Sequence, residues 1–187
     1  MCAVGFSESR RNVLALPINF PLYRKQYTYG KTLMNIIRVS TYEETVLCFP
    51  VMQQLRVHLD LPAFLAATQR MKAQGYRLVA LADPEIRAVA GYRKMEMLAT
   101  GDVLYVDDLV TSESHRSHGY GKHLLDWLLE EAKRQQCQYL ELDSGLQRLH
   151  AHRFYEQNKL AKAAYHFSVP ALASTPWTAK LAGVKKT

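Results

Sequence analysis

Hydrophobic positions follow two different periods along this chain of 187 residues. Short apolar runs bounded by turn residues are typical of strands, and turns at Asp83-Pro84 and Gly101-Asp102 join three such runs in succession. Because such short turns connect antiparallel neighbours, these three strands are predicted to pair side by side. The predicted strands are 35–40, 77–82, 86–95, 103–111, 138–142 and 161–168.

Apolar residues at helical spacing predict helices between these strands. The clearest pattern follows Gly121, where leucines and a tryptophan recur on one face up to Ala132. Thr41 and Glu44 have capping-box spacing at the start of the first helix. The predicted helices are 42–56, 61–73, 120–135 and 146–157. A helix between two strands implies a parallel crossover, so the fold class is α/β, a mixed central sheet with helices on both faces.

The net charge of +7 lies at the two ends of the chain. Residues 1–33 hold five basic residues and one acidic residue, residues 168–187 hold three basic and no acidic residues, and residues 34–167 hold 16 of each. A nucleic-acid-binding body would carry a basic stripe of its own, so no nucleic-acid partner is predicted, and polyanion binding through the ends remains an alternative. We therefore predict a domain over 34–170, an N-terminal extension of unknown role over 1–33 and a C-terminal tail over 171–187.

Other function classes are excluded by what the sequence lacks. No run of about 20 uncharged apolar residues occurs, which excludes a membrane-spanning helix, and no membrane partner is predicted. Cys2, Cys48 and Cys137 are odd in number and form no Cys-x-x-Cys pair, which indicates a reducing compartment and predicts a cytoplasmic location. Histidines cluster between 115 and 152, but no His-Glu-x-x-His or Cys/His pattern occurs, and no metal site is predicted.

The segment with the most chemical information joins the strand at 103–111 to the helix at 120–135. Arg116, Gly119 and Gly121 lie directly before or at the start of that helix. The first N–H groups of a helix have no internal partners, and glycines let the backbone approach a phosphate closely. Arg116 and Lys122 add positive charge. The segment therefore predicts an anion site, with a plain strand–loop–helix connection as the alternative reading.

Arg116-x-x-Gly119-x-Gly121 resembles the pyrophosphate-binding signature of the GNAT superfamily of acetyl-CoA-dependent N-acyltransferases. The preceding segment 105–110 (YVDDLV) looks like that family's splayed fourth strand, and 151–156 (AHRFYE) is similar to its later helix motif. The resemblance covers about residues 34–167. It implies the GNAT fold, an acetyltransferase activity, acetyl-CoA as co-substrate and an amine as acceptor.

The resemblance also implies roles for individual residues. The strand residues would pair with the pantetheine arm, with the Leu109 N–H facing the thioester oxygen, and the loop amides with the Arg116 charge would hold the pyrophosphate. Tyr155 would protonate the departing thiolate, and Asp107 would take the proton of the amine, directly or through water. The implied cofactor-binding residues are Leu109, Val110, Thr111, Arg116, Ser117, His118, Gly119, Tyr120, Gly121 and Lys122.

Simpler roles exist for both catalytic candidates. Adjacent strand residues point to opposite faces, so at most one of Asp107 and Asp108 is expected to line a given cleft, while the other caps a turn or pairs with an arginine. Tyr155 could be an amphipathic core residue with its hydroxyl at the surface.

The chain departs from the family pattern at three places. Lys159-Leu160 stands where Gly-Phe is common, Arg148 replaces an asparagine, and 171–180 shows no clear seventh strand. Because a clear seventh strand is missing, the acceptor side is expected to be unusual or to be completed by a second subunit of a homodimer. The predicted function is acetyl transfer from acetyl-CoA to an amine by direct attack in a ternary complex. The alternative is a GNAT-like module that binds acyl-CoA without catalysis. The sequence does not name the acceptor.

Overall fold

A single mixed sheet forms the centre of this computed structural model, which describes residues 25–29, 32–169 and 171. Its strands follow one another in chain order across the sheet, and every neighbouring pair is antiparallel except β5 and β6, which are parallel. The predicted mixed sheet is thereby confirmed. The strands are β1 (Lys25–Tyr29), β2 (Thr32–Val39), β3 (Arg77–Asp83), β4 (Glu85–Met97), β5 (Gly101–Thr111) and β6 (Tyr139–Leu142).

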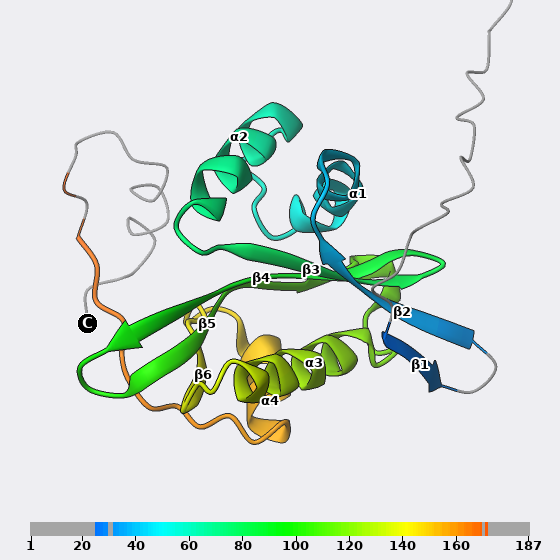
Figure 1. The fold of residues 1–187 in the computed structure, drawn as a ribbon. Coiled ribbons are helices and arrows are strands. Elements are labelled where there is room, and N and C mark those ends of the chain that lie inside the picture. The colour runs from blue at the N-terminus through cyan, green and yellow to red at the C-terminus, as the bar shows by residue number, and fades with distance from the viewer. Residues whose placement is uncertain (1–24, 30–31, 170, 172–187) are drawn as a thin grey trace, which may run out of the picture.

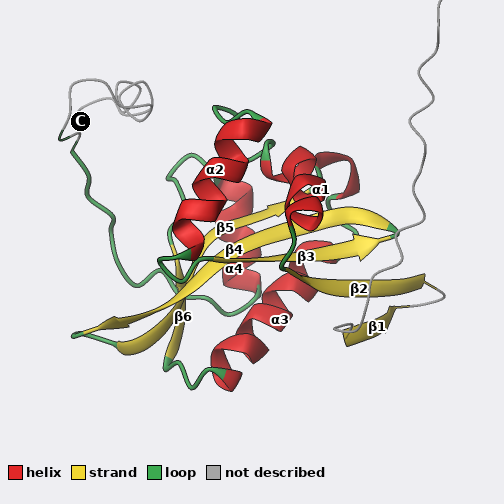
Figure 2. Ribbon diagram, turned by 45° about the horizontal axis from the view of Figure 1, so that its top comes forward, coloured by secondary structure: helices red, strands yellow, loops and turns green. Residues whose placement is uncertain are grey.

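Helices cover both faces of the sheet, as predicted. Helices α1 (Tyr42–Met52) and α2 (Leu61–Lys72) lie on one face, and α3 (Tyr120–Arg134) lies on the other with α4 (Leu149–Gln157) beside it (Figures 1 and 2). Thr41 caps α1 through the Glu44 N–H, and Glu44 returns the bond, which confirms the capping box.

The helices are held by two apolar layers, one on each face of the sheet. Cys48 and Met52 of α1 and Phe64 of α2 pack on one face. On the other face, Leu124 and Leu128 of α3 are fully buried, and each contributes about 1.5–3 kcal/mol to stability. This burial fixes the position of α3 against β5, and therefore the position of the loop that precedes α3.

The chain around the two predicted domain boundaries differs from expectation. Residues 161–168, predicted as a strand, are not part of the sheet; Tyr165 and Phe167 are 83% and 90% exposed. A segment of this composition forms a strand only where a neighbouring strand edge can pair with it. The last strand before it in the chain, β6, is only four residues long. At the other end, β1 and the start of β2 lie within the predicted extension. Residues 1–24 and 172–187 lie outside the described residues, and the boundaries at 33 and 171 stay predictions.

Two helix ends also differ from prediction. The helix predicted over 42–56 ends at Met52, so that residues 53–60 form a loop to α2. The helix predicted from 146 begins at Leu149, because a turn closed by the Arg148 N–H and the Gly145 carbonyl precedes it. The first of these differences matters for the site, since the loop after α1 supplies two of its side chains.

Candidate active site

The edge of β5 is open over its second half. β5 pairs with β6 from Val103 to Val106 and then continues to Thr111, where β4 is its one partner strand among the described residues. The predicted splayed strand is therefore present, since β6 covers only the first part of β5. An extended ligand can add to such an edge as a further strand.

The ladder between β4 and β5 decides which groups face that open edge. The Ser112 N–H donates to the Arg87 carbonyl at 2.8 Å. Because hydrogen-bonded and non-hydrogen-bonded pairs alternate in an antiparallel ladder, the main chain of Val110 also faces β4. The main-chain groups of Leu109 and Thr111 then face the open edge. Of the three predicted pantetheine residues, Leu109 and Thr111 offer backbone groups, and Val110 contributes a buried side chain.

A bulge interrupts β5 immediately before this stretch. Gly91 is opposite Asp108, whereas Tyr92 is opposite Val106, so Asp107 is an additional residue in the ladder. A bulge of this kind changes the direction in which the following groups point and increases the local twist. The bulge therefore decides the direction of the Leu109 N–H.

Five polar side chains meet at the bulge, and we call them the bulge cluster: Arg56, Tyr76, Arg93, Asp107 and Asp108. Arg93 donates to both oxygens of Asp107 at 2.7 and 2.9 Å. Arg56 Nε donates to Asp108 Oδ1 at 2.6 Å, and the Tyr76 hydroxyl donates to Asp108 Oδ2 at 2.8 Å. The Arg93 guanidinium lies 5.7 Å from the centre of the Tyr76 ring.

Asp107 and Asp108 therefore share one cluster, and the expectation that they point to opposite faces is wrong. That expectation assumed an uninterrupted strand, and the bulge breaks the alternation at Asp107. Burial and the nearby Asp108 charge raise the pKa of Tyr76 well above its usual value, so its hydroxyl stays protonated and donates. Hydrogen bonding to Asp107 raises the pKa of Arg93. The cluster pairs two carboxylates with two guanidinium groups.

The loop between β5 and α3 has the backbone shape of an anion cradle. Ser117 and Gly119 have φ values of 66° and 84°, both in the left-handed region. Gly119 is the N-cap of α3; no side-chain cap bond occurs there within the part of the chain that the structure describes, and the first turn holds no acidic residue. The first amides of α3 are therefore left for an external acceptor, and the helix dipole favours a negative one.

Little space is left around the first turn of α3. A Cβ at Gly121 would lie 3.0 Å from Thr111 Oγ1 and 3.6 Å from Phe154 Cζ. The glycine thus allows the helix start, the end of β5 and α4 to meet closely. Thr111 and Gly121, both predicted as binding residues, are neighbours in space.

The side chains of the predicted loop residues point in several directions. Arg116 is 59% exposed and pairs loosely with Glu113 at 3.5 Å. Lys122 donates to both oxygens of Asp126 at 2.7 and 2.8 Å, so its side chain runs along α3. His118 is bonded to the Arg116 carbonyl, and the buried Tyr120 donates to Asp83. For most of this loop, the groups available to a ligand are backbone amides.

Tyr155 lies on α4, next to the ring that faces the cradle. Phe154 approaches Gly121, and Tyr155 follows it in sequence and is half-buried. Burial raises the pKa of Tyr155 against the opposing effect of Arg148. Its hydroxyl therefore keeps its proton at neutral pH and is available as a donor.

Sequence reasoning missed Arg56, Tyr76 and Arg93, which lie far along the chain from the residues that they bind. Gln54 was missed as well; its Oε1 accepts the Glu113 N–H at 2.8 Å. One signal was present in the sequence. Gly91 is an isolated glycine inside a strand pattern, which indicates a bulge or a close approach.

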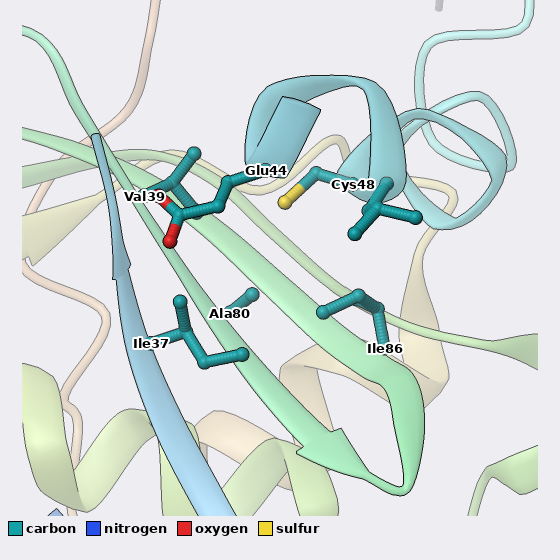
Figure 3. Close-up of a pocket in the computed structure, with 7 residues that line it drawn as sticks. Ile37, Val39, Glu44, Cys48, Ala80 and Ile86 are labelled. Atoms are coloured by element: carbon teal, nitrogen blue, oxygen red, sulfur yellow. The ribbon is translucent and has the colours of Figure 1, made fainter. Parts of the chain in front are cut away.

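Three further features bear on the function classes considered. No group of three or more His, Cys, Asp or Glu side chains that could hold a metal ion occurs within residues 34–169 and 171. In the part of the chain that the structure describes, no helix is long and apolar enough to cross a membrane. A small hollow between α1 and the sheet is lined mainly by apolar side chains (Figure 3), and its lining includes none of the cradle or bulge residues.

Known proteins resemble this chain in sequence and in fold. Residues 38–159 match the Acetyltransferase (GNAT) family. YhdJ of Bacillus subtilis (strain 168), an uncharacterized N-acetyltransferase, is 37% identical over 128 residues, which cover 66% of this chain and 88% of the relative.

Two solved structures show the same fold at low identity. The complex of AAC(6')-Iy with the bisubstrate analog CoA-S-monomethyl-acetylneamine has a TM-score of 0.66 at 13% identity, over 75% of this chain and 99% of the other. Glucosamine-6-phosphate N-acetyltransferase from Arabidopsis thaliana has a TM-score of 0.62 at 16% identity, over 74% and 98%. With the match to residues 38–159 and the fold together, this chain belongs to the acetyltransferase (GNAT) family.

Proposed function

We propose that this protein transfers an acetyl group from acetyl-CoA to an amine in a ternary complex. The observation that carries the proposal is the uncapped start of α3, directly beside the open edge of β5. The two features are joined through Thr111 and Gly121, where a Cβ would fill the space next to the helix start. One long ligand with an extended arm and a pyrophosphate fits this arrangement.

In this proposal the cofactor-binding residues act mainly through the backbone. Leu109 and Thr111 pair with the pantetheine arm as an added strand. The amides from Ser117 to Lys122 hold the pyrophosphate, and Arg116 leaves its weak pair with Glu113 to add charge. The proposal therefore includes all the predicted cofactor-binding residues from Leu109 to Lys122, most of them through backbone groups.

The reaction proceeds by attack of the neutral amine nitrogen on the acetyl carbonyl, with the C–S bond breaking as the C–N bond forms. The Leu109 N–H binds the carbonyl oxygen as negative charge develops, a contribution of about 2.7–4 kcal/mol for one such donor. Tyr155 protonates the departing thiolate. Asp107 accepts the proton that the amine loses, directly or through water, and Arg93 remains its ion-pair partner.

Two variants with matched controls test the assignments. Arg116→Ala is expected to raise the KM for acetyl-CoA, and Tyr155→Phe is expected to lower kcat by about 100-fold or more at nearly constant KM. Lys133→Ala removes a positive charge at the other end of α3, and Tyr139→Phe removes an exposed hydroxyl on β6, so both should behave as wild type. Thiol release from acetyl-CoA, measured over a panel of amines, is the assay. Wild-type kinetics in Arg116→Ala and Tyr155→Phe contradict these roles.

One observation favours the alternative, a module that binds acyl-CoA without catalysis. Both oxygens of Asp107 accept hydrogen bonds from Arg93, so this carboxylate is already paired with a side chain of its own sheet. Calorimetry with acetyl-CoA separates the two proposals when it is combined with the amine panel. Binding without turnover of any amine supports the module, and turnover supports the enzyme.

The cellular setting also belongs to the proposal. Cys48 and Cys137 are free thiols, which supports a reducing, cytoplasmic location. The homodimer stays a prediction.

A further inference from the structure

We infer that Arg56 is a positioning residue, which sets the direction of the Leu109 N–H for the acetyl carbonyl. The inference rests on the proposed function. Arg56 belongs to the loop between α1 and α2, not to the sheet that contains Leu109. Its effect on the reaction is therefore indirect and passes through the bulge of β5.

One guanidinium holds two different groups at the bulge. Arg56 Nη2 donates to the Asp107 carbonyl at 2.9 Å, and Nε donates to Asp108 Oδ1 at 2.6 Å. The carbonyl belongs to the peptide before Asp108, and the carboxylate is the Asp108 side chain. With both held, the peptide before Asp108 and the Asp108 side chain are restrained, and the Leu109 N–H belongs to the next peptide along the strand.

The remaining contacts of Asp108 also fix the position of its side chain. Its side chain is buried, at 8% exposure, and its second oxygen accepts from the Tyr76 hydroxyl. Asp108 is thus a buried carboxylate whose two oxygens are both held by neighbouring side chains. Such a pair holds geometry, because a planar guanidinium fork accepts only a narrow range of partner positions.

The same loop also reaches the far end of the open stretch. Gln54 accepts the Glu113 N–H, two residues beyond the end of β5. The open stretch is therefore held at its beginning by Arg56 and just past its end by Gln54. A side chain from outside the sheet thus shapes the edge that would receive the thioester.

The test compares the affinities for acetyl-CoA and for CoA, which differ only by the acetyl group. Calorimetry on wild type, Arg56→Ala and Arg56→Lys gives the ratio of the two affinities, and the amine panel gives kcat. Arg70→Ala is the matched control, since it removes an exposed positive charge at the end of α2. Melting temperatures report whether each variant is folded.

We expect Arg56→Ala to bind CoA within about twofold of wild type and to lose the preference for acetyl-CoA. Its kcat should fall by at least about tenfold, and by no more than the about 10²–10³-fold typical for complete loss of an oxyanion donor. Arg56→Lys keeps the charge but cannot replace the fork, so its ratio should also fall. Arg70→Ala should keep both the ratio and kcat.

Several outcomes overturn the inference while the proposed function stands. The inference is overturned if Arg56→Ala keeps both the wild-type affinity ratio and the wild-type kcat. It is also overturned if wild type binds CoA and acetyl-CoA with equal affinity. If Arg56→Ala does not fold, Arg56→Lys decides: a wild-type ratio and kcat refute a geometric role. If wild type binds neither molecule, the proposed function itself fails, and the inference fails with it.

Discussion

Gly91→Ala should disrupt the bulge cluster from the opposite side of the ladder. A Cβ at Gly91 would lie 1.9 Å from the Tyr76 hydroxyl oxygen, 2.4 Å from Cζ and 2.6 Å from Cε2. Tyr76 is only 4% exposed, so its ring has little space into which it can move. The added methyl group must therefore displace the ring, and with it the hydrogen bond to Asp108.

The loss of folding stability in Gly91→Ala can be estimated from three contributions. Losing a hydrogen bond to a charged group costs about 1.5–3 kcal/mol. Overpacking of a dense region costs about 1–3 kcal/mol more, and replacing glycine in a strand returns about 0.5–1 kcal/mol. The free energy of unfolding should therefore fall by about 2–5 kcal/mol. Because the cluster also holds the bulge, the preference for acetyl-CoA should fall as well.

Urea denaturation followed by circular dichroism measures the stability, with the m-value as a check on two-state unfolding. Tyr76→Phe removes only the hydroxyl and should cost about 1.5–3 kcal/mol. In a Tyr76→Ala background the new methyl group has no ring to meet, so Gly91→Ala should then cost less than about 1 kcal/mol. Equal costs of Gly91→Ala in both backgrounds would refute the reasoning.

Three further predictions concern pH, thiol chemistry and the cradle. Burial acts to raise the pKa of Glu131, but hydrogen bonds from Arg134 and neighbouring groups outweigh it and the pKa is lowered. The stabilisation is therefore present above the ordinary glutamate pKa of about 4.3 and lost as pH falls through the folded-state value. Glu131→Gln should flatten the acid slope of urea stability, and equal slopes contradict this. Burial raises the pKa of Cys48 to about 12, so its thiol stays protonated and unreactive in the folded protein. In a Cys2→Ser variant, a disulfide reagent at pH 8 should therefore modify Cys48 only after unfolding. Rapid labelling of Cys48 in the folded protein would contradict this prediction. Gly119→Ala places a side chain at φ 84°, which costs about 1–2 kcal/mol and should raise the KM for acetyl-CoA, whereas Gly119→Asn should be milder; equal KM values in both variants and wild type count against the cradle.

Local patterns were sufficient for most of the helices and strands, and they predicted the cradle. The period of α3, the capping box at Thr41 and the short turns around β4 depend on neighbours a few residues away, so the sequence predicts them directly. Arg116, Gly119 and Gly121 lie within a few residues of a helix start. In the structure, this is the start of α3, where Gly119 provides no side-chain cap. The strand predicted over 161–168 shows where this reasoning stops, because a strand also needs an edge to pair with.

The sequence by itself determined the order of the helices and strands from β2 to α4 and the mixed sheet, and it predicted an anion site before α3. Only the tertiary structure decided how the reacting edge is held. The bulge at Asp107 depends on the register between two strands, and Arg56 and Tyr76 reach the adjacent Asp108 from 52 and 32 positions away. Side-chain partners this distant depend on the packing of whole layers, whereas a helix start depends on adjacent backbone groups. The net charge of the chain gave no indication of this cluster, because its two arginines and two aspartates compensate each other.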